Sequence, residues 1–127
     1  MHYIGLMSGT SVDAIDAALV AIDGPGQIRL LATHAHPYPP DVRAQILALT
    51  LAESNTELSE DSELERAGEL DMALGRLFAD AANRVREKTS LLVSDIRAIG
   101  SHGQTLRHRP RAAHPFTIQI AKSFCHR

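Results

Sequence analysis

Residues 3–26 read YIGLMSGTSVDAIDAALVAIDGPG and set the architecture of the chain. Residues 3–7 form a short apolar run that predicts a strand, and the small polar residues after it predict a tight turn. The mostly apolar residues 14–22 predict a second, buried strand, and residues 23–26 (DGPG) are a strong turn signal. With residues 28–34 as a third strand, this part of the chain is expected to form a β-meander.

Two helices are predicted after the meander. Residues 37–40 interrupt the sheet, and a proline in the first turn of a helix loses no hydrogen bond, so a helix is expected from there to about Ala52. After a polar loop, Ser62 with Glu65 fits a capping box at the start of a second helix that should run to about Lys88. The apolar stripe of this helix consists of Leu64, Ala67, Leu70, Leu74, Leu77, Phe78, Ala81 and Val85.

Two further strands are predicted near the end of the chain. Residues 96–100 (IRAIG) are expected to form a strand that ends in a loop at residues 101–105. Residues 116–120 (FTIQI) alternate like a strand and follow a loop with two prolines. The predicted order is therefore β-β-β-α-α-β-β, which indicates one α/β domain. Because the sheet opens with a meander, it should be mixed rather than purely parallel.

The composition is that of an ordinary soluble domain. Of 127 residues, 44% are hydrophobic and 22% are charged. No apolar run is long enough for a membrane-spanning helix, and the first residues do not resemble a secretory signal. Cys125 is the one cysteine, which excludes a disulfide within the chain and a multi-cysteine metal site. We expect a reducing, cytoplasmic compartment, and the low aromatic content argues against base stacking.

Charge is unevenly distributed along the chain. Residues 53–71 hold eight acidic side chains and one basic one, whereas residues 97–127 hold six basic side chains and no acidic one. A basic end is compatible with a phosphate or nucleic-acid partner. The scattered positions of the basic residues favour instead a solvated acidic helix that lies near a basic loop.

The turn between the first two predicted strands carries the sharpest chemical signal. Phosphate groups are held by backbone N–H groups and small hydroxyls at close range. Gly9 lets the backbone approach, and the neighbouring hydroxyls belong to Ser8, Thr10 and Ser11. Asp13 or Asp16 could hold Mg²⁺ between the loop and a phosphate. The turn matches neither a Walker loop nor a dinucleotide-binding fingerprint, and an ordinary hairpin turn is the alternative.

The predicted strand end at residues 101–105 is a second candidate site, because open α/β sheets bind ligands at the carboxyl ends of strands. Its polar side chains, which can hydrogen-bond sugar hydroxyls, are Ser101, His102, Gln104 and Thr105. Ser101 and His102 cannot pair as in a hydrolase, because adjacent strand residues point to opposite faces. His102, His108 and His114 fit no metal-site template, and surface histidines are the alternative.

Three motifs together resemble a known family. They are IGLMSGTSVDAID at residues 4–16, AIGSHGQTLRHRP at residues 98–110 and FTIQI at residues 116–120. This combination resembles the N-terminal portion of the anhydro-N-acetylmuramic acid kinases, which belong to the sugar kinase/Hsp70/actin superfamily. The resemblance covers about residues 3–120.

The resemblance implies a fold and a reaction. The fold would be the N-terminal lobe of an actin-like (ribonuclease H-like) α/β fold, in which a mixed sheet opens with a three-stranded β-meander and helices pack on it. Members of the family bind ATP with Mg²⁺ between two such domains. They phosphorylate O6 of 1,6-anhydro-N-acetylmuramic acid while water opens the anhydro bridge, which gives N-acetylmuramic acid 6-phosphate in cytoplasmic cell-wall recycling. Homodimers, and no nucleic-acid or membrane partner, are expected.

The same resemblance assigns site residues. The ATP-binding residues would be Gly9, Thr10, Ser11, Val12, Asp13, Ala14, Ile15 and Asp16. The residues beside the sugar would be Ser101, His102, Gln104 and Thr105.

The sequence departs from the family pattern at three points. Ala14 stands where the family usually has glycine, and its Cβ could crowd a phosphate or forbid a turn with positive φ. The family continues after residue 120 with a glycine-containing turn and a helix, whereas residues 121–127 read AKSFCHR. We therefore expect a kinase lobe at residues 1–120 and a divergent tail at 121–127, as in a truncated or frameshifted chain.

The third departure is length, because the general base and the second lobe of the family would lie beyond residue 127. No residue of this chain is therefore assigned as catalytic, and the chain alone is expected to be inactive. Two alternatives remain: a non-catalytic half-domain that binds nucleotide or pairs with a partner, and a basic phosphate or nucleic-acid binder.

Overall fold

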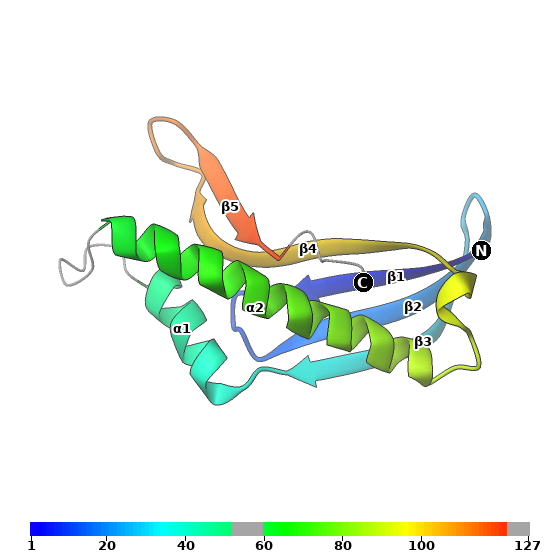
Figure 1. The fold of residues 1–127 in the computed structure, drawn as a ribbon. Coiled ribbons are helices and arrows are strands. Elements are labelled where there is room, and N and C mark those ends of the chain that lie inside the picture. Colours follow the sequence, from blue (N-terminus) through cyan, green and yellow to red (C-terminus); the bar gives the residue numbers. More distant parts are fainter. Residues whose placement is uncertain (52–59, 122–127) are drawn as a thin grey trace.

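The computed structural model describes residues 1–51 and 60–121 (Figure 1). The elements are β1 (His2–Ser8), β2 (Ala14–Gly24), β3 (Gln27–Pro37), α1 (Pro40–Thr50), α2 (Glu60–Glu87), the 3₁₀ helix η1 (Val93–Asp95), β4 (Ile96–Arg109) and β5 (Phe116–Ile120). The predicted order of strands and helices is confirmed. The predicted polar loop before α2 lies mostly outside the described residues.

The strands form one mixed sheet of five strands in the order β3-β2-β1-β4-β5. β1 and β4 are parallel, and the other neighbouring pairs are antiparallel. The opening meander and the mixed α/β architecture are therefore confirmed. Because β1, β3 and β4 run in one direction, their carboxyl ends, the turn after β1 and the start of α1 meet at one end of the sheet (Figure 1).

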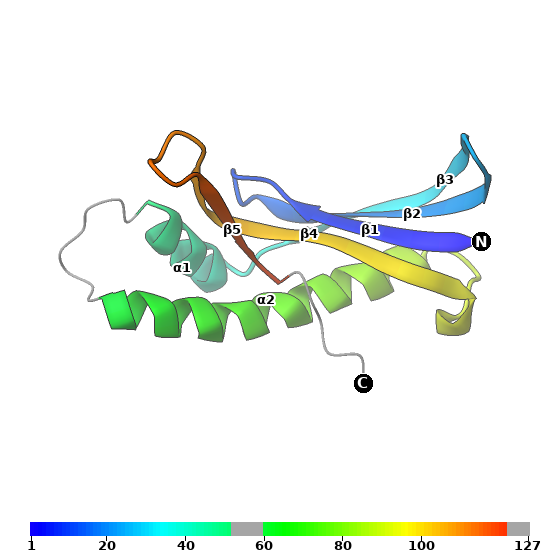
Figure 2. The ribbon, with the colours of Figure 1, turned by 90° about the horizontal axis from the view of Figure 1, so that it is seen from above.

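Both long helices pack on the same face of the sheet (Figure 2). Alternate residues of β1 and β2 point toward them, which is the period expected of a strand with one buried face. The largest fully buried side chains in this core are Phe78, Ile15, Leu19, Ile46, Leu70, Leu74, Gln104, Val12 and Val85. None of the described helices is long and apolar enough to cross a membrane.

No described element covers the opposite face of the sheet (Figure 2). The residues at its centre are small, and Gly5 pairs there with Ala18 on one side and Gly100 on the other. They form the floor of a hollow of about 530 Å³ that Met7 and Asp16 also line. We call this surface the helix-free face.

Two details of α2 differ from the prediction. The helix begins at Glu60, so Ser62 is its third residue and the predicted capping box is wrong. Leu64, which was assigned to the apolar stripe, is 75% exposed. The first helical turns extend beyond the sheet (Figure 1), and the half-buried side of this part of α2 carries Glu63 and Ala67 while Leu64 points to solvent.

The strand predicted for residues 96–100 is much longer in the structure. β4 continues through residues 101–105 to Arg109 and forms a hairpin with β5, so the predicted loop is wrong. The register with β1 shifts between the pairs Leu6–Ser101 and Ser8–Gln104. Gly103 has φ of 75° at this point, and such a conformation allows an extra residue in a strand without ending it.

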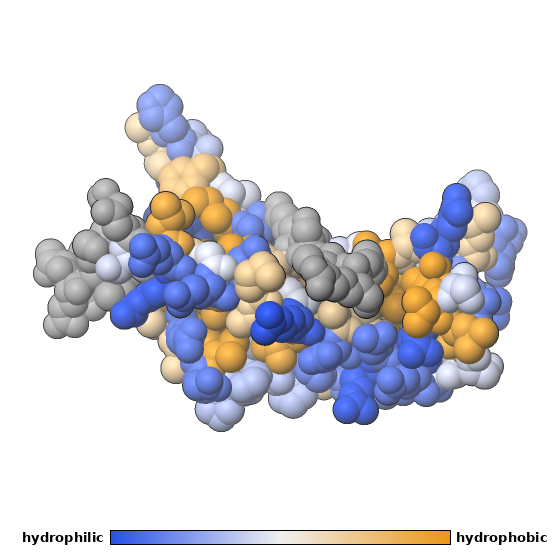
Figure 3. All heavy atoms as spheres, viewed as in Figure 1, coloured by the Kyte–Doolittle hydropathy of each residue, from blue (hydrophilic) through white to orange (hydrophobic). Residues whose placement is uncertain are grey.

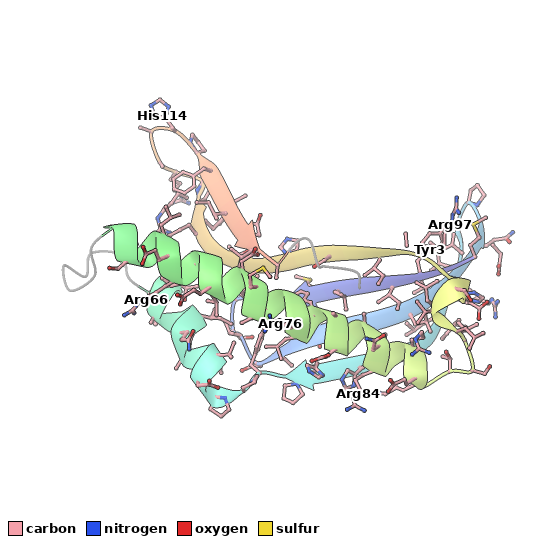
Figure 4. The ribbon with its side chains drawn as sticks, in the orientation of Figure 1. Tyr3, Arg66, Arg76, Arg84, Arg97 and His114 are labelled. Atoms are coloured by element: carbon pink, nitrogen blue, oxygen red, sulfur yellow. The ribbon has the colours of Figure 1, made fainter. Side chains whose placement is uncertain are left out.

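The charged segments lie as the solvated-helix interpretation predicts, as far as they are described. An Arg107 guanidinium nitrogen is 3.4 Å from a Glu63 carboxylate oxygen, which joins the basic strand β4 to the acidic part of α2. Hydrophilic residues cover much of the exposed surface of α2 (Figure 3). Arg97 and His114 lie at opposite ends of the molecule (Figure 4), so the part of this segment that the structure describes, up to residue 121, is spread along the molecule.

His34 should make the stability of the chain depend on pH. Its pKa lies below 6.5 because burial, His36, Lys88 and Arg84 all disfavour the charged ring. As pH falls below about 6.5, the imidazole of His34 is therefore protonated more readily in the unfolded chain than in the folded one. The free energy of unfolding decreases over this range until pH has passed the folded-state pKa. We expect His34→Gln to reduce the loss of unfolding free energy between pH 7.5 and 5.5, measured by urea denaturation. His114→Gln, at the exposed β4–β5 turn (Figure 4), is the control, and an equal effect of both variants would contradict the assignment.

Candidate functional site

The two sequence motifs meet at the carboxyl ends of the parallel strands β1 and β4. Ser8 is the last residue of β1 and pairs with Gln104 of β4. The turn at residues 9–13 follows directly and leads into β2. Ligands of open α/β sheets bind at such strand ends, so the fold places both candidate segments where a site is expected.

A buried chain of hydrogen bonds connects the two motifs. The Tyr38 hydroxyl donates to Ser8 Oγ at 2.8 Å, and Ser8 Oγ donates to Gln104 Oε1 at 2.5 Å. Gln104 Nε2 donates in turn to the Thr105 carbonyl at 3.1 Å. Burial raises the pKa of Tyr38, with a smaller opposing effect of the Ser8 hydrogen bond, so the phenol stays a hydrogen-bond donor. Since Ser8 is buried, its hydroxyl supports the turn from the core side instead of facing a ligand.

The turn itself is anchored by Val12. Its side chain is fully buried in the core, and its N–H donates to the Gly9 carbonyl at 3.1 Å. Val12 has φ of 55°, a conformation that β-branched residues rarely adopt. Within residues 1–51 and 60–121, the N–H groups of Thr10 and Ser11 have no hydrogen-bond acceptor. The turn is therefore fixed on its inner side and has donors left on its outer side.

Arg43 of α1 contacts the other side of the turn. Its Nε donates to the Val12 carbonyl at 3.0 Å, and one terminal nitrogen donates to the Ser11 carbonyl at 3.3 Å. The same guanidinium lies 3.9 Å from a carboxylate oxygen of Asp13. Asp13 is 78% exposed, so its carboxylate remains accessible from solvent.

The residues predicted to bind ATP divide into two groups. Gly9, Thr10, Ser11, Val12 and Asp13 form the turn, whereas Ala14, Ile15 and Asp16 are the first residues of β2. The side chains of Val12 and Ile15 are buried in the core and do not face a ligand. Asp16 pairs with Met7 and lines the hollow of the helix-free face.

Ala14 does not need the conformation that only glycine adopts easily. It pairs with Pro37 as the first residue of β2, and its φ is not positive. The expectation that an alanine here forbids the turn is therefore wrong, because the left-handed residue is Val12, two positions earlier.

The four predicted sugar-binding residues differ in burial and in their hydrogen bonds. Ser101 Oγ donates to the Ala121 carbonyl at 3.0 Å and accepts from the Gly103 N–H. Gln104 is completely buried and belongs to the hydrogen-bond chain described above. Thr105 Oγ1 accepts from Gln119 Nε2, and His102 is exposed. Within the described residues, no three His, Cys, Asp or Glu side chains form a metal-binding cluster.

Sequence reasoning missed Tyr38 and Arg43. Both residues carried a signal. Tyr38 is a large aromatic residue among prolines directly after a strand, and Arg43 is a basic residue in the first turn of a helix, where the helix dipole disfavours positive charge. Each is explained by its contact with the turn.

Fold and site together define a mixed α/β lobe with a glycine- and hydroxyl-rich turn braced at the ends of two parallel strands. A family model described as anhydro-N-acetylmuramic acid kinase matches residues 1–125. The chain therefore belongs to this family.

Curated relatives agree with the family match. The chain is 45% identical over 119 residues to the anhydro-N-acetylmuramic acid kinase of Coxiella burnetii (strain RSA 493 / Nine Mile phase I), and the match covers 94% of this chain and 29% of the relative. It is 50% identical over 119 residues to that of Idiomarina loihiensis, with coverage of 94% and 30%. The chain thus spans less than a third of the length of these relatives.

Proposed function

We propose that this chain is the N-terminal lobe of an ATP-dependent anhydro-N-acetylmuramic acid kinase with an actin-like fold. In the complete protein the lobe would bind the phosphates of ATP and one side of 1,6-anhydro-N-acetylmuramic acid, whose O6 receives the phosphoryl group. The observation that carries the proposal is the braced turn at residues 9–13, with donors facing outward at the end of parallel strands. The strand order, with a meander followed by a strand parallel to β1, supports the actin-like assignment.

The turn fits a magnesium-bound polyphosphate. The N–H groups and hydroxyls of Thr10 and Ser11 would donate to phosphate oxygens, since exposed donors at a glycine turn suit anions. The carboxylates of Asp13 and Asp16 are hard oxygen ligands, and either one would hold Mg²⁺ directly or through water. An Mg²⁺ ion held by these carboxylates would supply charge neutralisation for the transferred phosphoryl group.

The sugar would lie against β4. His102 is exposed on the strand, and we propose that it contacts the sugar together with Thr105. Ser101 lies on the opposite face of the strand, where its hydroxyl bonds the Ala121 carbonyl and the Gly103 N–H, and it would shape this strand end rather than meet the same side of the sugar. Gln104 would support the site from the buried side of β4 without touching the sugar, because its hydrogen bonds with Ser8 and the Thr105 carbonyl keep the two strand ends in register. Phosphoryl transfer needs groups from both sides of a cleft, and this lobe supplies only one side.

Amide NMR of this chain, without and with Mg²⁺-ATP, tests the proposal. Shifts confined to residues 9–16 and their neighbours are expected, whereas a spectrum unchanged by nucleotide would contradict nucleotide binding. In parallel, the chain mixed with ATP and the anhydro sugar should release no ADP, with a full-length relative as positive control. Release of ADP by the chain alone would show that the lobe is sufficient for turnover.

Gly9→Ala separates binding from folding. A Cβ at this position would meet only Ser11 Oγ, at 3.9 Å, so the free chain should keep its stability. A phosphate that approaches the Gly9 backbone would meet the new methyl group, and we expect about tenfold weaker Mg²⁺-ATP binding by calorimetry, equivalent to roughly 1.4 kcal/mol. Gly68→Ala, in open space on α2, is the control that should leave affinity unchanged. Equal affinity of the Gly9 variant would place the phosphates elsewhere.

A second function, pairing with a partner, is favoured by the helix-free face. Leu30 and Ile28 pair with outward-facing residues of β2 and are each 63% exposed, and Met7 is exposed farther along the same face. Exposed apolar patches of this kind often mark protein interaction sites. Sedimentation equilibrium distinguishes the two functions, because a concentration-dependent dimer would support pairing and a monomer at all concentrations would oppose it.

A further inference from the structure

We propose that Arg43 is a positioning residue of the turn at residues 9–13. By bridging two consecutive carbonyls, its guanidinium would hold the turn in the shape that leaves the Thr10 and Ser11 amides available to an anion. The inference rests on the proposed function for its purpose, because the anion would be the polyphosphate of the nucleotide. The bridging contact itself is a property of the free chain.

The contact uses the geometry of arginine. Two different nitrogens of one planar guanidinium donate to the Val12 and Ser11 carbonyls, at 3.0 and 3.3 Å. A rigid fork loses little conformational freedom on binding two acceptors, whereas a lysine ammonium is a flexible point charge. Lysine at this position would keep the positive charge near Asp13 but would not reproduce the fork.

The turn needs such a contact because its conformation is strained. Val12 holds a positive φ, an unfavourable conformation for a β-branched residue that persists only where the surroundings enforce it. The buried Val12 side chain fixes one side of the residue, and Arg43 fixes its carbonyl on the other. With these carbonyls directed to Arg43, the amides of Thr10 and Ser11 remain without an acceptor in the described part of the chain.

The segment before α1 places the arginine. Tyr38 is fixed through its hydroxyl to Ser8, just before the turn, and α1 begins two residues later at Pro40. The Arg43 N–H donates to the Pro39 carbonyl at 3.0 Å, which closes the first helical turn. Residues 38–43 therefore hold the turn at residues 9–13 at both ends, with Tyr38 at the β1 side and Arg43 at the β2 side.

The competing role for Arg43 is direct charge attraction to the phosphates, since its side chain is 44% exposed. Arg43→Lys and Arg43→Ala distinguish the two roles. If the bridge positions the turn, both variants should loosen the turn in the free chain. If charge alone matters, the lysine variant should behave like the wild type.

The first readout needs no nucleotide. Hydrogen exchange of the Val12 amide, which donates to the Gly9 carbonyl, should become about tenfold faster in both Arg43 variants, the change expected for losing a charge-assisted hydrogen bond. Amides of the sheet should exchange as before, which verifies that the variants fold. Arg84→Ala removes an equally charged, 66% exposed arginine on α2 and is the control for net charge. Unchanged exchange at Val12 in the alanine variant would overturn the proposal.

The second readout is affinity for Mg²⁺-ATP. Both Arg43 variants should bind about tenfold more weakly, with no change for Arg84→Ala. Wild-type affinity in the lysine variant, or weaker binding without faster exchange, would overturn positioning in favour of direct charge attraction. If the wild-type chain itself does not respond to Mg²⁺-ATP, the proposed nucleotide site fails, and the exchange data still decide whether Arg43 holds the turn.

Discussion

Leu74→Ala should destabilise the chain by about 2–5 kcal/mol in urea unfolding, the range for a large-to-small change in a packed core. Leu74 is completely buried where α2 packs on the sheet. The substitution removes apolar contacts and leaves a cavity that a helix lying on a flat sheet cannot easily close. Since domains of this size are stable by only about 5–15 kcal/mol, much of the folded population could be lost.

Leu64→Ala is the matched control, because it makes the same change in the same helix at a 75% exposed position. Its unfolding free energy should stay within about 0.5 kcal/mol of the wild type. A large loss for Leu64→Ala would mean that the Leu64 side chain itself packs against a surface. A small loss for Leu74→Ala would contradict the packing of α2 on the sheet.

Gln104→Glu should destabilise the chain by about 3–5 kcal/mol at pH 7.5, the cost typical of an uncompensated buried charge. Gln104 has no exposed surface, and its Nε2 donates to the Thr105 carbonyl. In the variant, a carboxylate oxygen would face that carbonyl oxygen and no donor would lie between them. The change replaces one amide by a group of nearly equal shape, so packing is kept and the charge alone is tested.

The pH dependence of this variant has a definite sign. Burial and the facing carbonyl should raise the folded-state pKa of the new carboxyl above its unfolded value of about 4.3. Below about pH 4.3 the new carboxyl is protonated in both the folded and the unfolded chain. The neutral acid can then donate to the Thr105 carbonyl as the amide does. The deficit relative to the wild type should therefore be small near pH 4 and grow as pH rises through the folded-state pKa.

Gln45→Glu, on the exposed side of α1, is the control for this experiment, and it should show no comparable loss. Urea midpoints of the three proteins between pH 4 and 8 provide the measurement. A deficit that is independent of pH would mean that the hydrogen bonds of the amide, rather than the absence of charge, make Gln104 important.

Most of the architecture could be predicted from local patterns. The apolar runs of the first three strands and the turn between the second and third define a meander without further information. The apolar stripe of α2 predicted its buried side, with the exception of Leu64. That residue fits the helical period but lies beyond the sheet, and periodicity does not say where a partner surface ends.

Predictions failed where tertiary contacts override local signals. Glycine and small polar residues at 101–105 resemble a loop, but pairing with β1 and β5 extends the strand through them. In the same way, Ser62 fits a capping motif inside a helix that begins two residues earlier. The candidate turn was found from its residue types, whereas Tyr38 and Arg43 were not, because their role depends on contacts across about 30 positions of sequence.

The helix-free face has a consequence for the kinetics of folding. A segment of the same polypeptide would cover this face in a first-order process, at a rate independent of protein concentration. Association of two uncovered faces is second order and becomes faster as chains accumulate. The exposed edge strand β3, with Ile28 and Leu30, adds a second route to the same self-association. Slow synthesis at low concentration therefore favours the covered state, and rapid overproduction favours aggregates.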